Sequence, residues 1–115
     1  MSDVYRSAVE QLSRVTGVRG AVIAESGTGL PVIAELADEV SGEALAALAT
    51  ALFRRGTHAT EGAGLGALRS VQLETSAGHV VAVAAGELVL AVLAAADAQL
   101  GLVRLETHRA ASLLT

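Results

Sequence analysis

Hydrophobic and polar residues recur along this chain with two different periods, and each change of period marks the start of a new segment. Spacings of three and four residues, typical of amphipathic helices, occur over residues 2–16, 41–63 and 97–114. Short runs rich in valine, leucine and isoleucine, bounded by glycine-containing turns, indicate strands. These predicted strands cover residues 18–25, 30–36, 68–75, 79–84 and 87–93. The predicted order of elements is therefore α-β-β-α-β-β-β-α.

We expect the chain to be organised around the central helix, residues 41–63. Ser41 is its predicted N-cap, and Glu43 places a carboxylate near the positive end of the helix dipole. One apolar stripe, predicted to face the core, consists of Leu45, Leu48, Ala49, Leu52 and Phe53. A second stripe carries only methyl side chains, from Ala44, Ala47 and Ala51, and the polar arc holds Glu43, Ala46, Thr50, Arg54 and Thr57.

The two stripes together are wider than the apolar face of an ordinary surface helix. Small residues let a second helix approach closely, so the alanine stripe predicts dimerisation through this helix. The alternative is a central helix that is buried on all sides within one domain, for which a chain of 115 residues offers little material.

The last three predicted strands are separated by two tight turns, which is typical of an antiparallel meander. A five-stranded antiparallel sheet flanked by helices is an α+β fold, and we expect residues 1–115 to form a single domain. Pro31 cannot donate a hydrogen bond, so it should begin its strand or lie at a sheet edge. Asp97 is the predicted cap of the last helix, whose inner face is Leu100, Val103, Thr107, Ala110 and Leu114.

Composition and charge exclude several classes of function. Eight basic residues stand against 12 acidic ones, and only 2% of residues are aromatic, which disfavours a nucleic-acid partner. Every basic residue is arginine, so Schiff-base chemistry and a phosphate-loop lysine are absent, and the lack of cysteine removes thiolate chemistry. The longest apolar run, residues 88–96, is too short to span a bilayer, and the N-terminus lacks a signal-peptide pattern. We therefore expect no membrane insertion and a cytoplasmic protein.

The sequence holds no recognisable catalytic centre. Residues 62–67 loosely match a dinucleotide-binding glycine pattern, but a helix precedes them and a strand follows, which reverses the order that such a site requires. His58, His79 and His108 are far apart in the sequence, so no metal site is predicted. We expect no catalytic, cofactor-binding or metal-binding residues, and the protein is predicted not to be an enzyme.

A mixed-charge surface on the central helix remains as the candidate site. It consists of Glu43, Thr50, Arg54, Arg55 and His58. It is either a solvated helix face, whose arginines complement the helix dipole, or a face on which a partner docks.

Several motifs in a fixed order resemble the roadblock/dynein light chain family. They are residues 18–23 (VRGAVI), residues 29–32 (GLPV) after the turn, the alanine-rich helix 43–53, residues 88–93 (LVLAVL) and residues 99–104 (QLGLVR). The resemblance extends from about residue 4 to residue 114 and identifies the chain as similar to bacterial single-domain members. It implies an α-β-β-α-β-β-β-α fold and a homodimer, in which the central helices pair antiparallel and the third strands join into one continuous sheet. The implied dimer contacts are Ala44, Ala47, Leu48, Ala51, Arg55, Leu68, Ser70, Gln72 and Glu74.

The family resemblance also implies a function. Its members are non-catalytic partners of Ras-like small GTPases, acting as scaffolds or, in some bacterial cases, as GTPase-activating proteins. We therefore expect a homodimeric regulator or scaffold that binds a bacterial Ras-like small GTPase through Glu43, Thr50, Arg54, Arg55 and His58, without a cofactor. The alternatives are a structural subunit of a larger complex without GTPase regulation, and a small-ligand-binding or enzymatic domain.

Two departures from the family pattern are visible. Thr28 precedes Gly29 where an acidic residue is usual, which should change only the detail of the turn. The chain also stops near the end of its last helix, without the C-terminal extension of some bacterial activators, which favours binding over activation.

Overall fold

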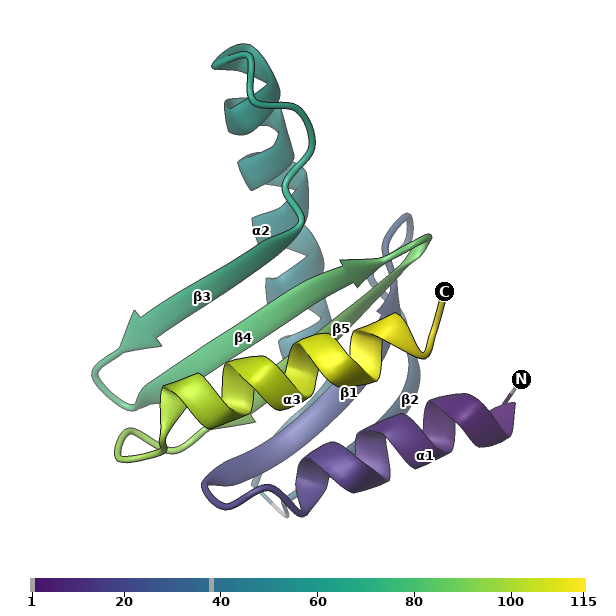
Figure 1. Ribbon diagram of the computed structural model, residues 1–115, viewed down its shortest axis with the longest axis vertical. Coiled ribbons are helices and arrows are strands. Elements are labelled where there is room, and N and C mark those ends of the chain that lie inside the picture. The colour runs from purple at the N-terminus through teal and green to yellow at the C-terminus, as the bar shows by residue number, and fades with distance from the viewer. Residues whose placement is uncertain (1, 38) are drawn as a thin grey trace.

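The computed structural model describes residues 2–37 and 39–115 and has the predicted order of elements (Figure 1). These are α1 (Ser2–Ser13), β1 (Val18–Glu25), β2 (Pro31–Leu36), α2 (Gly42–Gly62), β3 (Ser70–Thr75), β4 (Gly78–Ala85), β5 (Leu88–Ala94) and α3 (Leu100–Ser112). The prediction of an α+β fold with the order α-β-β-α-β-β-β-α is confirmed.

The five strands form one antiparallel sheet with the order β2-β1-β5-β4-β3. The predicted meander β3–β4–β5 is present, and β5 then pairs with β1, with Ala21 opposite Val92. β2 and β3 therefore lie at the two edges of the sheet. Pro31 begins edge strand β2, where the lack of an N–H donor does least harm.

Helices cover both faces of the sheet, so the molecule has three layers (Figure 1). On one face α1 and α3 lie side by side, and their apolar residues pack with Ile23, Leu90 and Val92 of the central strands. On the other face, Leu45 and Phe53 of α2 pack with residues such as Val22 and Val89, whose side chains point to the opposite side of the same strands. The central strands are consequently apolar on both faces, which explains their unbroken hydrophobic runs.

Most element boundaries lie within one or two residues of the prediction, and three differences change how the chain is held. α1 ends at Ser13 and not at residue 16. The N-cap of α3 is Gln99, so the prediction that Asp97 caps this helix is wrong. Asp97 lies instead in a turn closed by the Ala98 N–H, which donates to the Ala95 carbonyl as the chain leaves β5.

The third difference concerns the start of β3, which begins at Ser70 and not at residue 68. The Leu68 N–H donates to Thr57 Oγ1 of α2 over 3.3 Å between nitrogen and oxygen, and its side chain packs against the α2 core. Leu68 is therefore held by α2, whereas the Arg69 carbonyl already accepts a hydrogen bond from the Ala84 N–H of β4.

None of the helices in residues 2–37 and 39–115 is both long enough and apolar enough to cross a lipid bilayer.

Candidate interaction surfaces on the central helix

The two halves of α2 have different surroundings. The Ser41 hydroxyl accepts a hydrogen bond from the Ala44 N–H over 3.2 Å, which confirms the predicted N-cap. Every buried residue of the helix lies before Arg54, and residues 54–62 are exposed or half-buried. This C-terminal half extends beyond the ends of the strands (Figure 1). α2 is thus anchored by its first half and presents its second half to solvent.

The face that α2 turns to the sheet differs from the predicted one. Its buried residues are Leu45, Ala46, Ala49, Thr50 and Phe53. Leu48 was expected inside but is 40% exposed, whereas Ala46 and Thr50 were expected on the polar arc and are buried. Small side chains at positions 46 and 49 let the helix axis approach the sheet closely. The Thr50 hydroxyl can be buried because it donates to the Ala46 carbonyl over 2.9 Å.

One side of α2 presents an apolar surface next to the sheet edge formed by β3. We call it the seam surface, and it consists of Ala44, Ala47, Leu48 and Ala51 of α2 with Val71 and Leu73 of β3. Ala44 and Leu48 line a depression of about 290 Å³ together with Val80 and Leu93, which are on β4 and β5. Because β4 is the neighbour of β3, the exposed side of α2 points toward this edge.

Two residues of the seam surface, Val71 and Leu73, were missed by the sequence analysis. Both are half-buried and pack with the α2 side of the sheet. The β3 residues predicted for the dimer contact, Ser70, Gln72 and Glu74, are exposed and alternate with these two. Since Ser70 and Gln72 pair with Val83 and Val81, residues of the α1–α3 core, they lie on the face away from α2. The period-two alternation in this strand was the signal that could have identified Val71 and Leu73.

An ion pair closes one end of the depression. Arg19 Nη2 lies 2.6 Å from Glu39 Oε1, and both residues line the depression. The hydrogen bond from its own backbone N–H, followed by the hydrogen bond and charge of Arg19, holds the pKa of the Glu39 carboxyl below its usual value of 4.5. The pair joins β1 to the segment that leads into α2.

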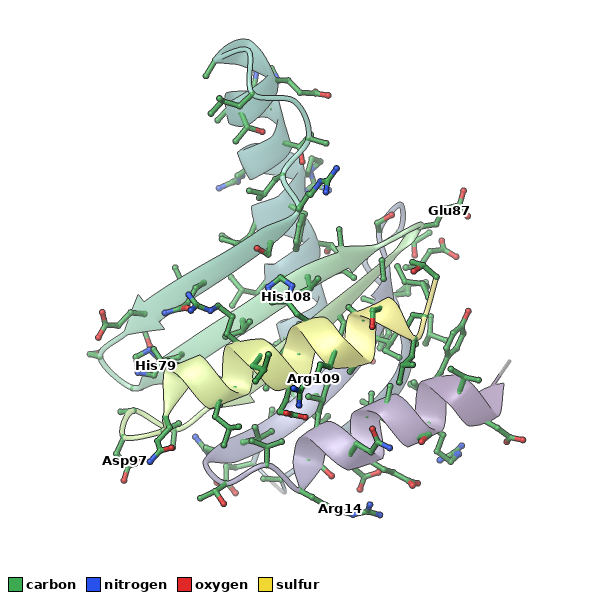
Figure 2. The ribbon with its side chains drawn as sticks, viewed as in Figure 1. Arg14, His79, Glu87, Asp97, His108 and Arg109 are labelled. Carbon is green, nitrogen blue, oxygen red and sulfur yellow. The ribbon has the colours of Figure 1, made fainter. Side chains whose placement is uncertain are left out.

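A second surface is a groove of about 550 Å³ beside the C-terminal half of α2. The helix contributes Arg54, Thr57, His58 and Glu61. The β1–β2 turn contributes Ser26 and Gly27, and the end of the β4–β5 hairpin contributes Gly86, Leu88 and Val89. Figure 2 shows Glu87 at the tip of the β4–β5 hairpin, on the side of the sheet from which α2 projects. Apolar residues with a polar and charged rim are typical of a protein docking site.

The residues predicted to bind a partner do not all share this surface. Arg54 and His58 line the groove, and Glu43 is exposed near the start of α2. Arg55 is exposed but does not line the groove. The prediction is wrong for Thr50, which is only 5% exposed and whose hydroxyl is already bonded to the helix backbone. The groove residues Ser26 and Glu61 were missed, because the fold brings the turn and the helix together from distant parts of the sequence.

Neither surface has the composition of a metal or catalytic centre. Among the residues that the structure describes, no three histidine, aspartate or glutamate side chains are grouped so that they could hold a metal ion. His79 is buried on β4, where its Nε2 lies 3.1 Å from the Ala96 carbonyl oxygen, far along the chain from α2. The seam surface is apolar, whereas the groove combines apolar residues with the charged side chains of Arg54 and Glu61.

Comparison with known proteins yields a consistent set of similarities. The model of the Roadblock/LC7 domain matches residues 6–94. An uncharacterized protein of Methanocaldococcus jannaschii is 34% identical over 101 residues, which cover 88% of this chain and 85% of that protein. The solved Roadblock/LC7 domain from Streptomyces avermitilis is 27% identical with a TM-score of 0.82, over 92% of this chain and 90% of that one. Myxococcus xanthus MglB, 17% identical, shares the fold with a TM-score of 0.88 over 98% of this chain and 86% of its own.

Proposed function

The chain belongs to the Roadblock/LC7 domain family, and from this membership we propose that it is a non-catalytic homodimeric regulator or scaffold that binds a Ras-like small GTPase. One observation carries the proposal: the seam surface leaves apolar side chains of α2 exposed beside the free edge of β3. A GTPase partner would place the protein in the cytoplasm. We further propose that residues 1–115 act as one domain.

The seam surface supports a dimer in two ways. The methyl groups of Ala44, Ala47 and Ala51 allow the α2 helix of a second copy to approach closely, and Leu48 supplies apolar area beside them. The edge of β3 offers unpaired backbone N–H and C=O groups to the β3 strand of the same second copy. A twofold axis between the two β3 strands would extend the sheet across both protomers and bring both α2 helices to one face.

Replacing an alanine of the seam surface by glutamate tests the dimer. Ala51→Glu and Ala47→Glu would each bury an unpaired charge at the contact, which costs several kcal/mol per ion, so both variants should be monomeric. Ala96→Glu is the matched control, because Ala96 is exposed in the turn after β5. Light scattering should give at least twice the 11.5 kDa chain mass for the wild type and the control. A monomeric wild type, or two undisturbed variants, would refute the dimer.

We place the GTPase on the outer arc of α2 and in the groove beside it. Arg54 and His58 line the groove, Glu43 lies on the same outer arc, and Arg55 lies at its border. The C-terminal half of α2 stands clear of its own sheet, so a partner can reach both the helix and the β1–β2 turn. A GTPase lying across the twofold axis would cover the second copy of the site. We therefore expect two chains of this protein per GTPase.

Charge reversal tests the docking site. Exposed charges at an interface mainly tune encounter and specificity, so Arg54→Glu should weaken GTPase binding by about tenfold and leave the dimer intact. Arg14→Glu, in the exposed turn that follows α1, is the matched control. Calorimetry with a candidate Ras-like GTPase measures both affinities and the 2:1 stoichiometry. Equal affinity for the two variants would exclude Arg54 from the site.

The same proteins separate docking from direct participation in hydrolysis. An arginine finger is worth about 10³ or more in GTPase rate, and saturation with a variant that lacks it cannot restore turnover. Arg54 and Arg55 lie on a helix and not on a reaching loop, which supports docking. We expect the Arg54→Ala and Arg55→Ala variants to reach the wild-type rate at saturation. A rate that stays low at saturation would show that the arginine acts in hydrolysis.

The alternative role, a structural subunit without regulation, predicts a different dependence of GTPase binding on the bound nucleotide. A regulator should prefer one nucleotide state of the GTPase, because it must contact the segments that change between states. Equal binding to the GDP-bound and GTP-bound forms would favour the purely structural role. Stoichiometric nucleotide in the protein purified alone would instead favour a small-ligand-binding domain.

A further inference from the structure

We propose that the exposed side of α3 nearest to α1 is a second self-association surface, on which two copies of this chain pack α3 against α3 in antiparallel orientation about a twofold axis. This inference goes beyond the proposed function, which uses α2 and β3 on other parts of the molecule.

Exposed leucines concentrate on α3 and at its C-cap residue, Leu113. Leu102, Leu105 and Leu113 are 41%, 47% and 61% exposed, and they make up three of the eight exposed large hydrophobic side chains in the described residues. The inner face of the helix is already used, because Val103, Thr107, Ala110 and Ala111 are buried against the sheet. The exposed leucines are therefore additional to the core. Several such side chains on one helix indicate a contact surface, unlike single exposed leucines scattered over a protein.

Two of these leucines, Leu102 and Leu113, frame a pair of opposite charges. Leu102, Glu106, Arg109 and Leu113 follow one another at spacings of four, three and four residues, which places them along one side of the helix. Arg109 Nη1 donates to Glu106 Oε1 over 3.0 Å. In Figure 2, Arg109 points toward α1, whereas His108 points the opposite way, toward β3 and β4. The four residues thus form a leucine–glutamate–arginine–leucine row on the α1 side of α3.

This row is complementary to a second copy of itself. An antiparallel α3 pair whose twofold axis passes between positions 107 and 108 sets Leu102 opposite Leu113 of the second copy. The same axis sets Glu106 opposite Arg109 of the second copy. Apolar side chains then meet apolar ones at both ends, and each charge meets its opposite in the middle. An isologous contact requires this kind of self-complementarity.

The charges select the orientation and register of the contact more than its strength. An exposed ion pair contributes little to affinity by itself, but like charges brought together are strongly disfavoured. A parallel pairing would align Glu106 with Glu106 and Arg109 with Arg109. The antiparallel pairing instead gives an alternating group of four charges, and the flanking leucines supply the apolar area.

The α3 surface is independent of the seam surface. α3 and α2 cover opposite faces of the sheet, so one copy can use both at the same time (Figure 1). Pairing through α3 would therefore join two α2-linked dimers and add chains in steps of two. We expect the wild type to sediment as two chains when dilute and as four or more chains when concentrated.

Charge reversals on α3 give the sharpest test. Glu106→Arg leaves two arginines in the row and Arg109→Glu leaves two glutamates, so neither variant can pair with itself. An equimolar mixture of the two variants should pair again, because each then offers what the other lacks. Arg104→Glu is the matched control, since Arg104 is exposed but lies outside the row. Sedimentation velocity over a concentration series should show two chains for each single variant and four or more for the wild type, the control and the mixture.

The leucines are tested in the same way. Leu102→Ser combined with Leu113→Ser should raise the dissociation constant of the larger species by about tenfold or more, whereas Leu65→Ser, in the exposed loop before β3, should not change it. Circular dichroism checks that the variants fold. A wild type that never exceeds two chains, or an assembly unaffected by these changes, would overturn the α3 contact.

The outcome for the proposed function is read separately from the seam variants. If Ala51→Glu gives a monomer while the wild type stops at two chains, the α2 dimer stands and the α3 contact is refuted. If instead the α3 variants convert a two-chain wild type into single chains and Ala51→Glu has no effect, the α3 contact is supported and the α2 dimer is refuted.

Discussion

Gly29 lets the β1–β2 turn approach α2, and this contact gives a prediction at the scale of one residue. Its φ of +74° is a conformation that residues with a side chain rarely adopt, and a Cβ added there would lie 3.0 Å from Thr50 Oγ1. Gly29→Ala should therefore lower the free energy of unfolding by about 1–2 kcal/mol. Gly27→Ala, in the same turn, adds a Cβ that meets nothing within 4 Å and should change it by less than about 0.5 kcal/mol.

Urea denaturation of the two glycine variants measures both changes. The pair is matched because both alanines are introduced into one turn that also lines the groove. Equal losses for Gly29→Ala and Gly27→Ala would mean that the contact with Thr50 and the positive φ are unimportant for stability.

Glu39 gives the second prediction at this scale, which concerns pH. Its own backbone N–H and then Arg19 hold the pKa of its carboxyl below 4.5, so the charged form is favoured in the folded protein. A lowered pKa stabilises the fold at pH values above the unfolded pKa, and this contribution is lost as the pH falls through the lowered value. Carboxyl NMR titration should give a pKa below 4.5 for Glu39 in the wild type.

Removing Arg19 separates the two causes of the lowered pKa. In Arg19→Gln, the pKa of Glu39 should rise only part of the way to 4.5, because the backbone hydrogen bond remains. A return to the full unperturbed value would assign the whole effect to the ion pair. No rise at all would mean that the Arg19 contact is not maintained in solution.

At the scale of elements, α2 combines an anchored half with a projecting half. Residues 43–53 contact the sheet, whereas residues 54–62 contain no buried side chain. In the protein without a GTPase, backbone amides of residues 54–62 should exchange with deuterium faster than those of residues 45–53. Addition of the GTPase should slow exchange in residues 54–62 and in the β1–β2 turn. Protection confined to α1 would place the partner on the other face of the sheet.

The sequence predicted the elements better than their rotation and their neighbours. Local signals sufficed for the Ser41 cap, the turns and the antiparallel meander, because each depends on residues close in sequence. The orientation of α2 could not be read in the same way, since this helix is apolar over most of its circumference and only the sheet decides which side is inside. Thr50 looked like a surface residue because the bond to the Ala46 carbonyl that permits its burial has no sequence signature. The groove joins residues 26–27 to residues 54–61, and such a pairing needs the fold.

At the scale of the whole molecule, proposed self-association links stability to concentration. If the α2 dimer unfolds and dissociates together, a tenfold higher protein concentration adds about 1.4 kcal/mol to the stability of the dimer. The melting temperature of the wild type should then rise by roughly 3–5 °C per tenfold step. In the dilute range, where pairing through α3 does not occur, the melting temperature of Ala51→Glu should be independent of concentration. If the melting temperature of the wild type did not change with protein concentration, the subunits would separate before they unfold.

The edge of β3 presents only backbone N–H and C=O groups, and these groups are the same in every chain of this fold. In a cell that makes several such chains, the edge by itself would accept a relative as readily as a second copy. If the proposed dimer forms through this edge, the preference for a second copy over a related chain rests on nearby side chains such as Leu48, Val71 and Leu73. Like charges or a misfit in volume at those positions would exclude the wrong chain. A single substitution there can re-sort which chains meet while the fold stays intact, so new pairings can evolve without new architecture.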